Sequence, residues 1–173
     1  MGKLIADETR MFYVAGLRNA HAMETQAVQL LTRQVERLEN YPELEARMRE
    51  HLEESKAQRA RLEEVLHGMD EDYSALKEAV LGLGGNFAAL SHTAASDEII
   101  KNTLANYMFE HFEIAAYKSL TEMAEILGDA PAIAACQASL HEEELMAAWL
   151  DEHIAPTTRI FLERIQAGVP ASH

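Results

Sequence analysis

The sequence has little of several residue types, and each shortage excludes a class of protein. Among its 173 residues there is one cysteine, Cys136, so no disulfide forms within the chain, which fits a reducing compartment. Eight glycines, four prolines and 6% aromatic residues are too few for a turn-rich β-sandwich or a collagen-like chain. Lysine and arginine number 15 against 29 acidic residues, and this net charge of −14 disfavours nucleic acid and anionic membranes as partners.

Long hydrophobic stretches are absent as well. No apolar run approaches the roughly 20 residues that a membrane-spanning helix needs, and residues 1–10 lack the apolar segment of a signal peptide. We therefore expect a soluble, cytoplasmic protein with no nucleic-acid and no membrane partner. Its length predicts a single domain over residues 1–173.

Helix-forming residues dominate the chain, and glycine or proline stands mainly between helical stretches. Pro42, Gly68 and Gly128 mark helix boundaries, while Ser96 and Asp129 can cap the N-termini of the helices that follow them. We predict four long helices, over residues 8–40, 43–67, 97–127 and 130–155.

Two helical hairpins joined by one long crossover, here residues 69–95, are typical of the ferritin-like bundle. Composition alone does not separate this topology from a plain up-and-down bundle. We expect a short helix at 73–81 within the crossover and, after Pro156, a short C-terminal helix at 158–166. The predicted fold is an all-α four-helix bundle, and the spacing of its glutamates favours the ferritin-like topology.

Glutamates interrupt the apolar faces of these helices. On a helical wheel, the apolar residues of the first helix lie within about 40° of Glu24, and Glu113 and Glu143 pass the same test. Glu54 lies about 90° from the apolar stripe of its helix. Glu24 and Glu113 are 89 residues apart, as are Glu54 and Glu143, which hints at an internal duplication. Within each hairpin the two glutamates differ in height by only about 3–6 Å, so four carboxylates converge on the middle of the bundle.

Such a convergence needs compensation. A buried carboxylate costs several kcal/mol unless it is paired, protonated or bound to a cation. The inner faces of the first, third and fourth helices carry no lysine or arginine. We favour a pair of divalent metal ions as the compensation; the alternative is that two or three of these glutamates share protons or reach water.

Several stretches match a known family. They are Glu24, His51-Leu52-Glu53-Glu54-Ser55 with Gln58, Arg61 and Leu62, Glu110-His111-Phe112-Glu113-Ile114-Ala115-Ala116-Tyr117, and Leu140-His141-Glu142-Glu143. On these residues the chain resembles the YciE/YciF family of ferritin-like bacterial stress proteins, over nearly all of residues 8–155. The resemblance implies a bundle of the rubrerythrin di-iron type and a homodimer.

The chain departs from the usual ligand pattern of such bundles. They commonly take Glu-x-x-His from two of the helices, but Ala57 and Met146 stand where those histidines would be. The second helix offers His51 three residues before Glu54 instead. This predicts a carboxylate-rich site, and oxygen-rich ligation suits iron or manganese.

The residues expected to bind metal are Glu24, His51, Glu54, Glu110, Glu113 and Glu143. Glu110 is either an additional ligand or a partly solvated ion pair. Tyr117 is placed to bond a carboxylate or to donate an electron to an oxidised metal, or it is a core tyrosine with a satisfied hydroxyl. His21 could approach the edge of the site, whereas we expect His111 and His141 on the surface and Cys136 in the core.

Two functions of different class remain open. In the favoured one, two divalent ions, iron first with manganese or zinc as alternatives, are bridged by Glu54 and Glu143. Glu24 and Glu113 are end ligands, His51 supplies a nitrogen, and the ferrous centre reduces dioxygen or peroxide. In the other, the protein is a metal-poor, dimeric stress scaffold without catalysis. Iron storage is weaker still, because nothing in the sequence encodes a hollow shell of subunits.

Overall fold

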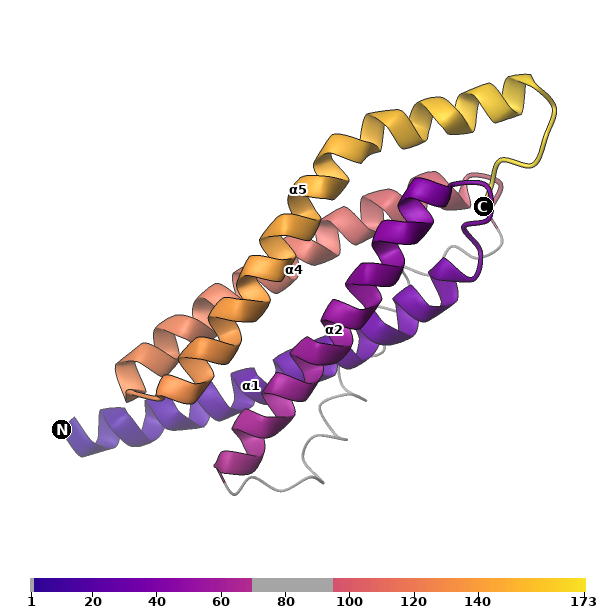
Figure 1. Ribbon diagram of the computed structural model, residues 1–173. Helices are drawn as coiled ribbons and strands as arrows, with labels where there is room; N and C mark the ends of the chain where they lie inside the picture. The colour runs from indigo at the N-terminus through magenta and orange to yellow at the C-terminus, as the bar shows by residue number, and fades with distance from the viewer. Residues whose placement is uncertain (1, 70–94) are drawn as a thin grey trace.

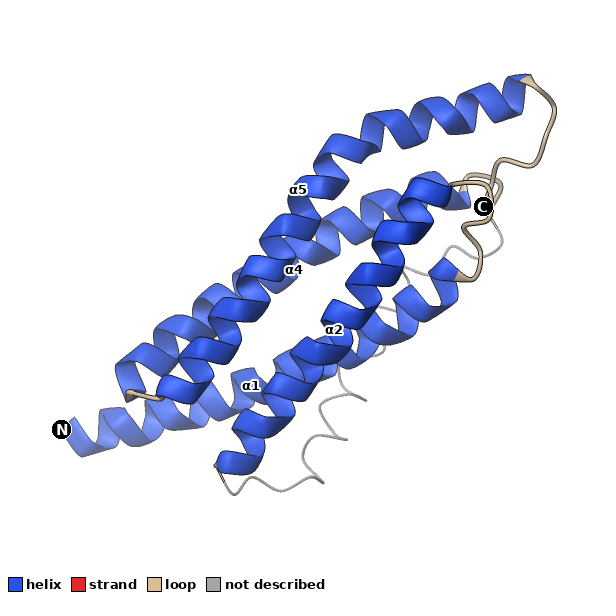
Figure 2. Ribbon diagram, viewed as in Figure 1, coloured by secondary structure: helices blue, strands red, loops and turns tan. Residues whose placement is uncertain are grey.

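A computed structural model of the chain describes residues 2–69 and 95–173. These residues form four helices, α1 (Gly2–Val35), α2 (Pro42–Gly68), α4 (Glu98–Leu127) and α5 (Ala130–Gln166), with no strand among them (Figures 1 and 2). The predicted all-α bundle is confirmed. The short helix predicted at 73–81 lies outside the described residues.

The helices pair in two hairpins, α1 with α2 and α4 with α5 (Figure 1). Contacts of α1 with α4 and of α2 with α5 close the bundle. Two apolar clusters fill its interior. One contains Tyr13, Leu17, Leu66 and Leu120, and the other contains Leu31, Val35, Met48, Ile99 and Leu150. Along α1 the first cluster extends from Tyr13 to Ala27 and the second begins at Leu31, so Glu24 has apolar packing above and below it.

The turn between the third and fourth predicted long helices was correctly placed. Gly128 adopts a left-handed conformation (φ 70°) that ends α4, as a helix-terminating glycine commonly does. Asp129 then caps α5, because its Oδ1 accepts a hydrogen bond of 3.1 Å from the backbone N–H of Ala132. The same carboxylate accepts a bond of 3.0 Å from the hydroxyl of Tyr13 on α1.

Both ends of the first predicted helix, 8–40, were wrong. The helix begins earlier, at Gly2, because residues 3–7 contain no helix breaker. It ends earlier, at Val35, because two turns follow it and bury the side chains of Leu38 and Tyr41. Arg37, in the first of these turns, donates two bonds of 2.7 and 2.6 Å to the carboxylate of Glu98 on α4.

The predicted cap of the third helix was also wrong. The N-cap is Asp97 rather than Ser96, and the Asp97 side chain makes no capping hydrogen bond. The Arg37–Glu98 ion pair fixes this end of α4 instead, and it places an acidic side chain in the first turn, where the helix dipole favours it.

The predicted break at Pro156 is absent. The separate helices predicted at 130–155 and 158–166 are one continuous helix, α5, with Pro156 inside it. A proline removes one backbone hydrogen bond and bends a helix, and Figure 1 shows α5 bending in its C-terminal part. Tertiary contacts carry the helix past the proline: Thr157 is buried and Phe161 packs against the apolar core. Within the described residues, none of the helices is both long and apolar enough to traverse a lipid bilayer.

Candidate metal centre

Four buried side chains from three helices meet in the middle of the bundle. They are His51 of α2, Glu110 and Glu113 of α4, and Glu143 of α5, and each is at most 2% exposed. One ligand atom from each lies within 4.8 Å of the others. This group could hold a metal ion, and all four members are among the residues predicted from the sequence.

Glu24 of α1 is fully buried, as its position on the apolar face predicted. The hydroxyl of Tyr117 donates a bond of 2.6 Å to its Oε1, while its Oε2 has no hydrogen-bond partner. Tyr117 therefore bonds a carboxylate, one of the roles expected for it. Glu24 is not a member of the four-residue group, but its charge interacts with those of Glu113 and Glu143.

The imidazole of His51 links the buried group to the rim. Its Nε2 lies 3.2 Å from Glu110 Oε2 and 3.8 Å from Glu143 Oε2, whereas its Nδ1 lies 2.9 Å from Glu54 Oε2. Because the two ring nitrogens face different carboxylates, Glu54 fixes the orientation of the ring and leaves Nε2 directed at the buried group.

Glu54 itself lies at the rim, with 32% of its side chain exposed. Both terminal nitrogens of Arg47 donate bonds of 3.1 Å to its Oε2. Burial alone would raise the pKa of Glu54, but the bonds from His51 and Arg47 outweigh burial and lower it. The structure therefore places Glu54 against a histidine and an arginine, outside the group of four.

Carboxylate oxygens at the centre lack donors. Among the described residues, no nitrogen and no alcohol or phenol hydroxyl donates to Glu113 Oε1, to either oxygen of Glu143 or to Glu24 Oε2, although all four atoms are buried. Glu143 instead faces the carboxyl groups of Glu110 and Glu113. Buried polar atoms almost always have a partner in native proteins. A divalent cation among these oxygens would supply that partner, and hard oxygen donors beside one imidazole nitrogen suit iron, manganese or zinc.

The electrostatics describe the charge of the site in the absence of a cation. Burial, with repulsion from the neighbouring carboxylates, raises the pKa of Glu113 and Glu143 well above the ordinary value, and burial raises that of Glu24 to about 8. Burial also opposes the charge of His51, but the negative charge and hydrogen bond of Glu110 raise its pKa. Without a cation, the site therefore retains protons that free glutamates would have lost at neutral pH.

A second arginine of α2 near this layer is occupied elsewhere. Arg61 donates bonds of 2.6 and 2.7 Å to Glu142 of α5, and Gln58 donates one of 3.0 Å to the same carboxylate. Arg61 also reaches the hydroxyl of Ser139 at 3.2 Å. The sequence analysis did not assign a role to Glu142. The available signal was that Glu142 is adjacent to Glu143 and that the facing helix carries an arginine, Arg61.

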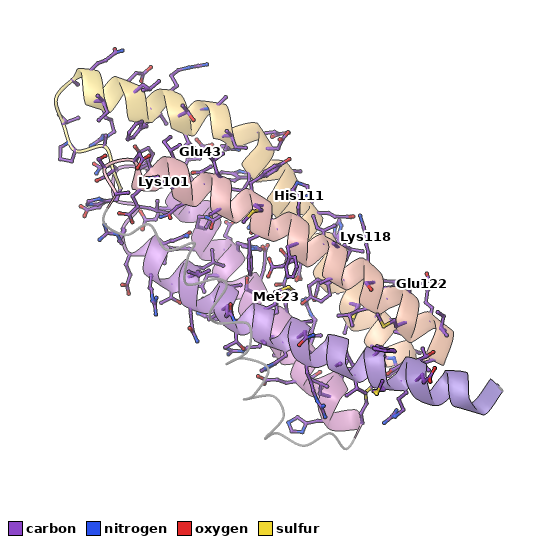
Figure 3. The ribbon with its side chains drawn as sticks, turned by 180° about the vertical axis from the view of Figure 1, so that it is seen from behind. Met23, Glu43, Lys101, His111, Lys118 and Glu122 are labelled. Carbon is purple, nitrogen blue, oxygen red and sulfur yellow. The ribbon has the colours of Figure 1, made fainter. Side chains whose placement is uncertain are left out.

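The remaining candidates have ordinary roles. His21 lies 2.9 Å from Glu63 rather than at the site. His111 and His141 are exposed, as predicted, and Figure 3 shows His111 on the outer side of α4. Cys136 is buried in the core, also as predicted.

Comparisons with known proteins agree with this architecture. A family model described as "Domain of unknown function (DUF892)" matches residues 8–163. A crystal structure of a protein from Xanthomonas campestris pv. campestris is 32% identical, with a TM-score of 0.76, over 91% of this chain and 99% of that one. The crystal structure of the E. coli stress protein YciF is 22% identical, with a TM-score of 0.69, over 85% of this chain and 94% of that one.

The second of these likenesses speaks to the fold alone, whereas the family model and the first relative span nearly the whole chain. The resemblance to the YciE/YciF proteins is thereby confirmed. The chain therefore belongs to the family described as DUF892.

Proposed function

We propose that this protein is a ferritin-like metal protein that holds two divalent ions, with iron as the native metal, in the middle of its bundle. The observation that carries the proposal is the set of buried carboxylate oxygens without donors around His51. We assign the ligands to His51, Glu110, Glu113, Glu143 and, through its free Oε2, Glu24.

The role proposed for Glu54 differs from the bridging role expected from the sequence. Its Oε2 already accepts bonds from Arg47 and from the ring of His51. A carboxylate in that position orients a metal-binding histidine and increases its basicity. We therefore propose Glu54 as the residue that positions His51.

Two ferrous ions at this site would supply the two electrons that reduce dioxygen or peroxide. The chain itself contributes the surroundings. The apolar clusters on both sides of the acidic layer exclude bulk water, which strengthens electrostatic interactions inside. The hydroxyl of Tyr117 holds one oxygen of Glu24 and so directs the other toward the remaining carboxylates.

Metal analysis tests the proposal. Protein purified without chelators and reconstituted aerobically with ferrous iron should contain about two iron ions per chain, because an assembled set of deprotonated ligands binds metal tightly. Less than about 0.5 iron plus manganese per chain would contradict it. The paired variant Glu113→Gln with Glu143→Gln should lose the metal, whereas Glu122→Gln, which removes an exposed carboxylate of α4, should keep it.

The competing function is a dimeric stress scaffold without catalysis, and the engagement of Glu54 by Arg47 is the observation in its favour. Rates of ferrous oxidation separate the two. A metal centre predicts a loss of rate in Glu24→Ala with Glu113→Ala, whereas a scaffold predicts no change. Light scattering tests the homodimer that the family resemblance implies, and a dimer also excludes a storage cage.

A role in a stress response in the cytoplasm is part of the same proposal. The stress role rests on the name of the E. coli relative, which is a stress protein, and the cytoplasmic location rests on the single cysteine of the sequence. Induction of the chain by osmotic, oxidative or heat stress, followed by immunoblotting of cell fractions, measures this directly; constant expression under all three would count against it.

A further inference from the structure

A pocket opens between α1 and α4 and ends at the acidic cluster. Its cavity volume is ≈ 20 Å³, which is room for about one molecule of the size of water. Three of the proposed ligands, His51, Glu110 and Glu113, form its floor and are buried. Figure 3 shows the face of the molecule on which α1 and α4 lie side by side. The pocket therefore connects this face with the proposed metal centre.

The walls of the pocket are apolar. Ala27, Leu31 and Phe109 line it where it is buried, and Leu30 and Ala105 line it nearer the mouth, where both are partly exposed. Apolar walls do not compensate the lost hydration of an ion. The carboxylates of the floor and the net charge of −14 also repel anions. Small neutral molecules are the class that this route admits.

Two carboxamides stand at the rim. Gln34 of α1 and Asn106 of α4 each donate one bond to the other, of 3.2 and 2.8 Å, and both are partly exposed. Asn106 also lies 3.9 Å from the sulfur of Met48 on α2. Because the paired amides satisfy each other, they fix the separation of the two helices at the mouth without placing a charge there.

We propose that this pocket is the site through which a small neutral oxidant of the size of dioxygen reaches the centre. The Gln34–Asn106 pair and Ala105 set the size of the molecule that enters. The biological meaning of the route rests on the proposed metal function. The access itself is a property of the folded chain and is measurable without metal.

Dissolved dioxygen is a suitable probe because it is paramagnetic and enhances the NMR relaxation of methyl groups that it approaches. The full chain, free of metal, is measured under raised oxygen pressure. Ala27 and Leu31 are 3% and 4% exposed, and Ala20 and Ala147 match them at 3% and 4% but do not line the pocket. We expect at least about threefold greater enhancement at the pocket methyls, because apolar cavities take up apolar gases. Equal enhancement at all four would overturn the proposal.

Two substitutions at the mouth should act in opposite directions. Ala105→Leu fills the opening and should lower the enhancement at Ala27 to that of the matched core methyls. Gln34→Ala removes the amide pair and should raise it. Ala115→Leu adds the same side chain at an exposed position of α4 outside the pocket and should change nothing. If Ala105→Leu does not fold, Ala105→Val should still lower the enhancement at Ala27 and Gln34→Ala should still raise it.

Nitric oxide binding to the iron-loaded protein connects the route with the centre. Nitric oxide resembles dioxygen in size and polarity, and its association with ferrous iron is followed by stopped-flow absorbance. Ala105→Leu should slow association at least about fivefold, with iron content unchanged, because access then limits the rate. An unchanged rate would overturn the route. Protein that holds no iron would contradict the metal function, while the oxygen relaxation measurement would still decide whether the pocket is open.

Discussion

The charge of Glu24 can be tested directly by a single substitution. Burial raises the pKa of this carboxyl from 4.5 to about 8. A carboxyl with a raised folded-state pKa binds more protons in the folded state than in the unfolded state. Its contribution to stability is therefore complete below pH 4.5 and is lost as the pH rises through about 8.

The variant Glu24→Gln removes this titration and leaves a side chain of the same shape to accept the bond from Tyr117. In chelator, its free energy of unfolding should fall less steeply than that of the parent protein between pH 5 and 8 and should exceed it by about 1–3 kcal/mol at pH 8. Urea unfolding at several pH values measures this. Glu122→Gln, which removes an exposed carboxylate, should keep the parent's slope; equal slopes in all three proteins would contradict the prediction.

Glu54 should act on metal affinity through His51. If it positions the imidazole, Glu54→Ala should weaken binding of Mn(II) or Fe(II) about 10–100-fold, as the loss of an orienting partner typically does. Calorimetric titration measures this. Glu53→Ala removes the neighbouring carboxylate, which pairs with Lys56 on the surface, and is the matched control. If Glu54→Ala lost as much affinity as Glu143→Ala, the prediction would be contradicted, and Glu54 would be a direct ligand of the metal.

At the scale of the element, the turn between α4 and α5 depends on one side chain. Asp129 caps α5 and also accepts the bond of the buried Tyr13 hydroxyl. Asp129→Ala should cost about 1 kcal/mol for the cap and a further 1–3 kcal/mol or so for the unsatisfied hydroxyl. Asp129→Asn keeps one carbonyl oxygen to cap α5 and turns its NH2 toward the Tyr13 hydroxyl, which can accept a bond from it, so this variant should cost less than Asp129→Ala.

Urea unfolding of the two variants, with and without Tyr13→Phe, separates the contributions. In the Tyr13→Phe background no hydroxyl remains to be satisfied, so Asp129→Ala should cost only the cap. Full additivity of the two substitutions would mean that the Tyr13–Asp129 bond contributes nothing to the packing of α1 against this turn.

The elements also show which features were predictable. Apolar periodicity within one helix placed Glu24, Glu113 and Glu143 on buried faces, because that pattern depends only on residues a few turns apart. The helical wheel also places Glu54 on the same side of its helix as Arg47. Which partners the Glu54 carboxylate binds was not predictable, because that depends on the side-chain orientations of Arg47 and His51. Local signals also failed at Pro156, because contacts of Phe161 with a distant part of the chain maintain the helix past the proline.

For the whole molecule, the proposed metal centre joins separate helices in one cooperative unit. The ligands come from α2, α4 and α5, and Glu24 brings in α1, so unfolding of any of them would break the site. A ligand that binds only the folded state stabilises it by about 2.7 kcal/mol when its free concentration is 100 times its dissociation constant. For a chain of this size, that should raise the thermal midpoint by about 5–11 °C.

Scanning calorimetry with Mn(II), which an unfolded chain binds weakly, measures the shift, and added chelator should reverse it. The paired variant Glu113→Gln with Glu143→Gln should show no rise, and a rise equal to that of the parent protein would mean that the ion binds the acidic surface instead of the buried cluster.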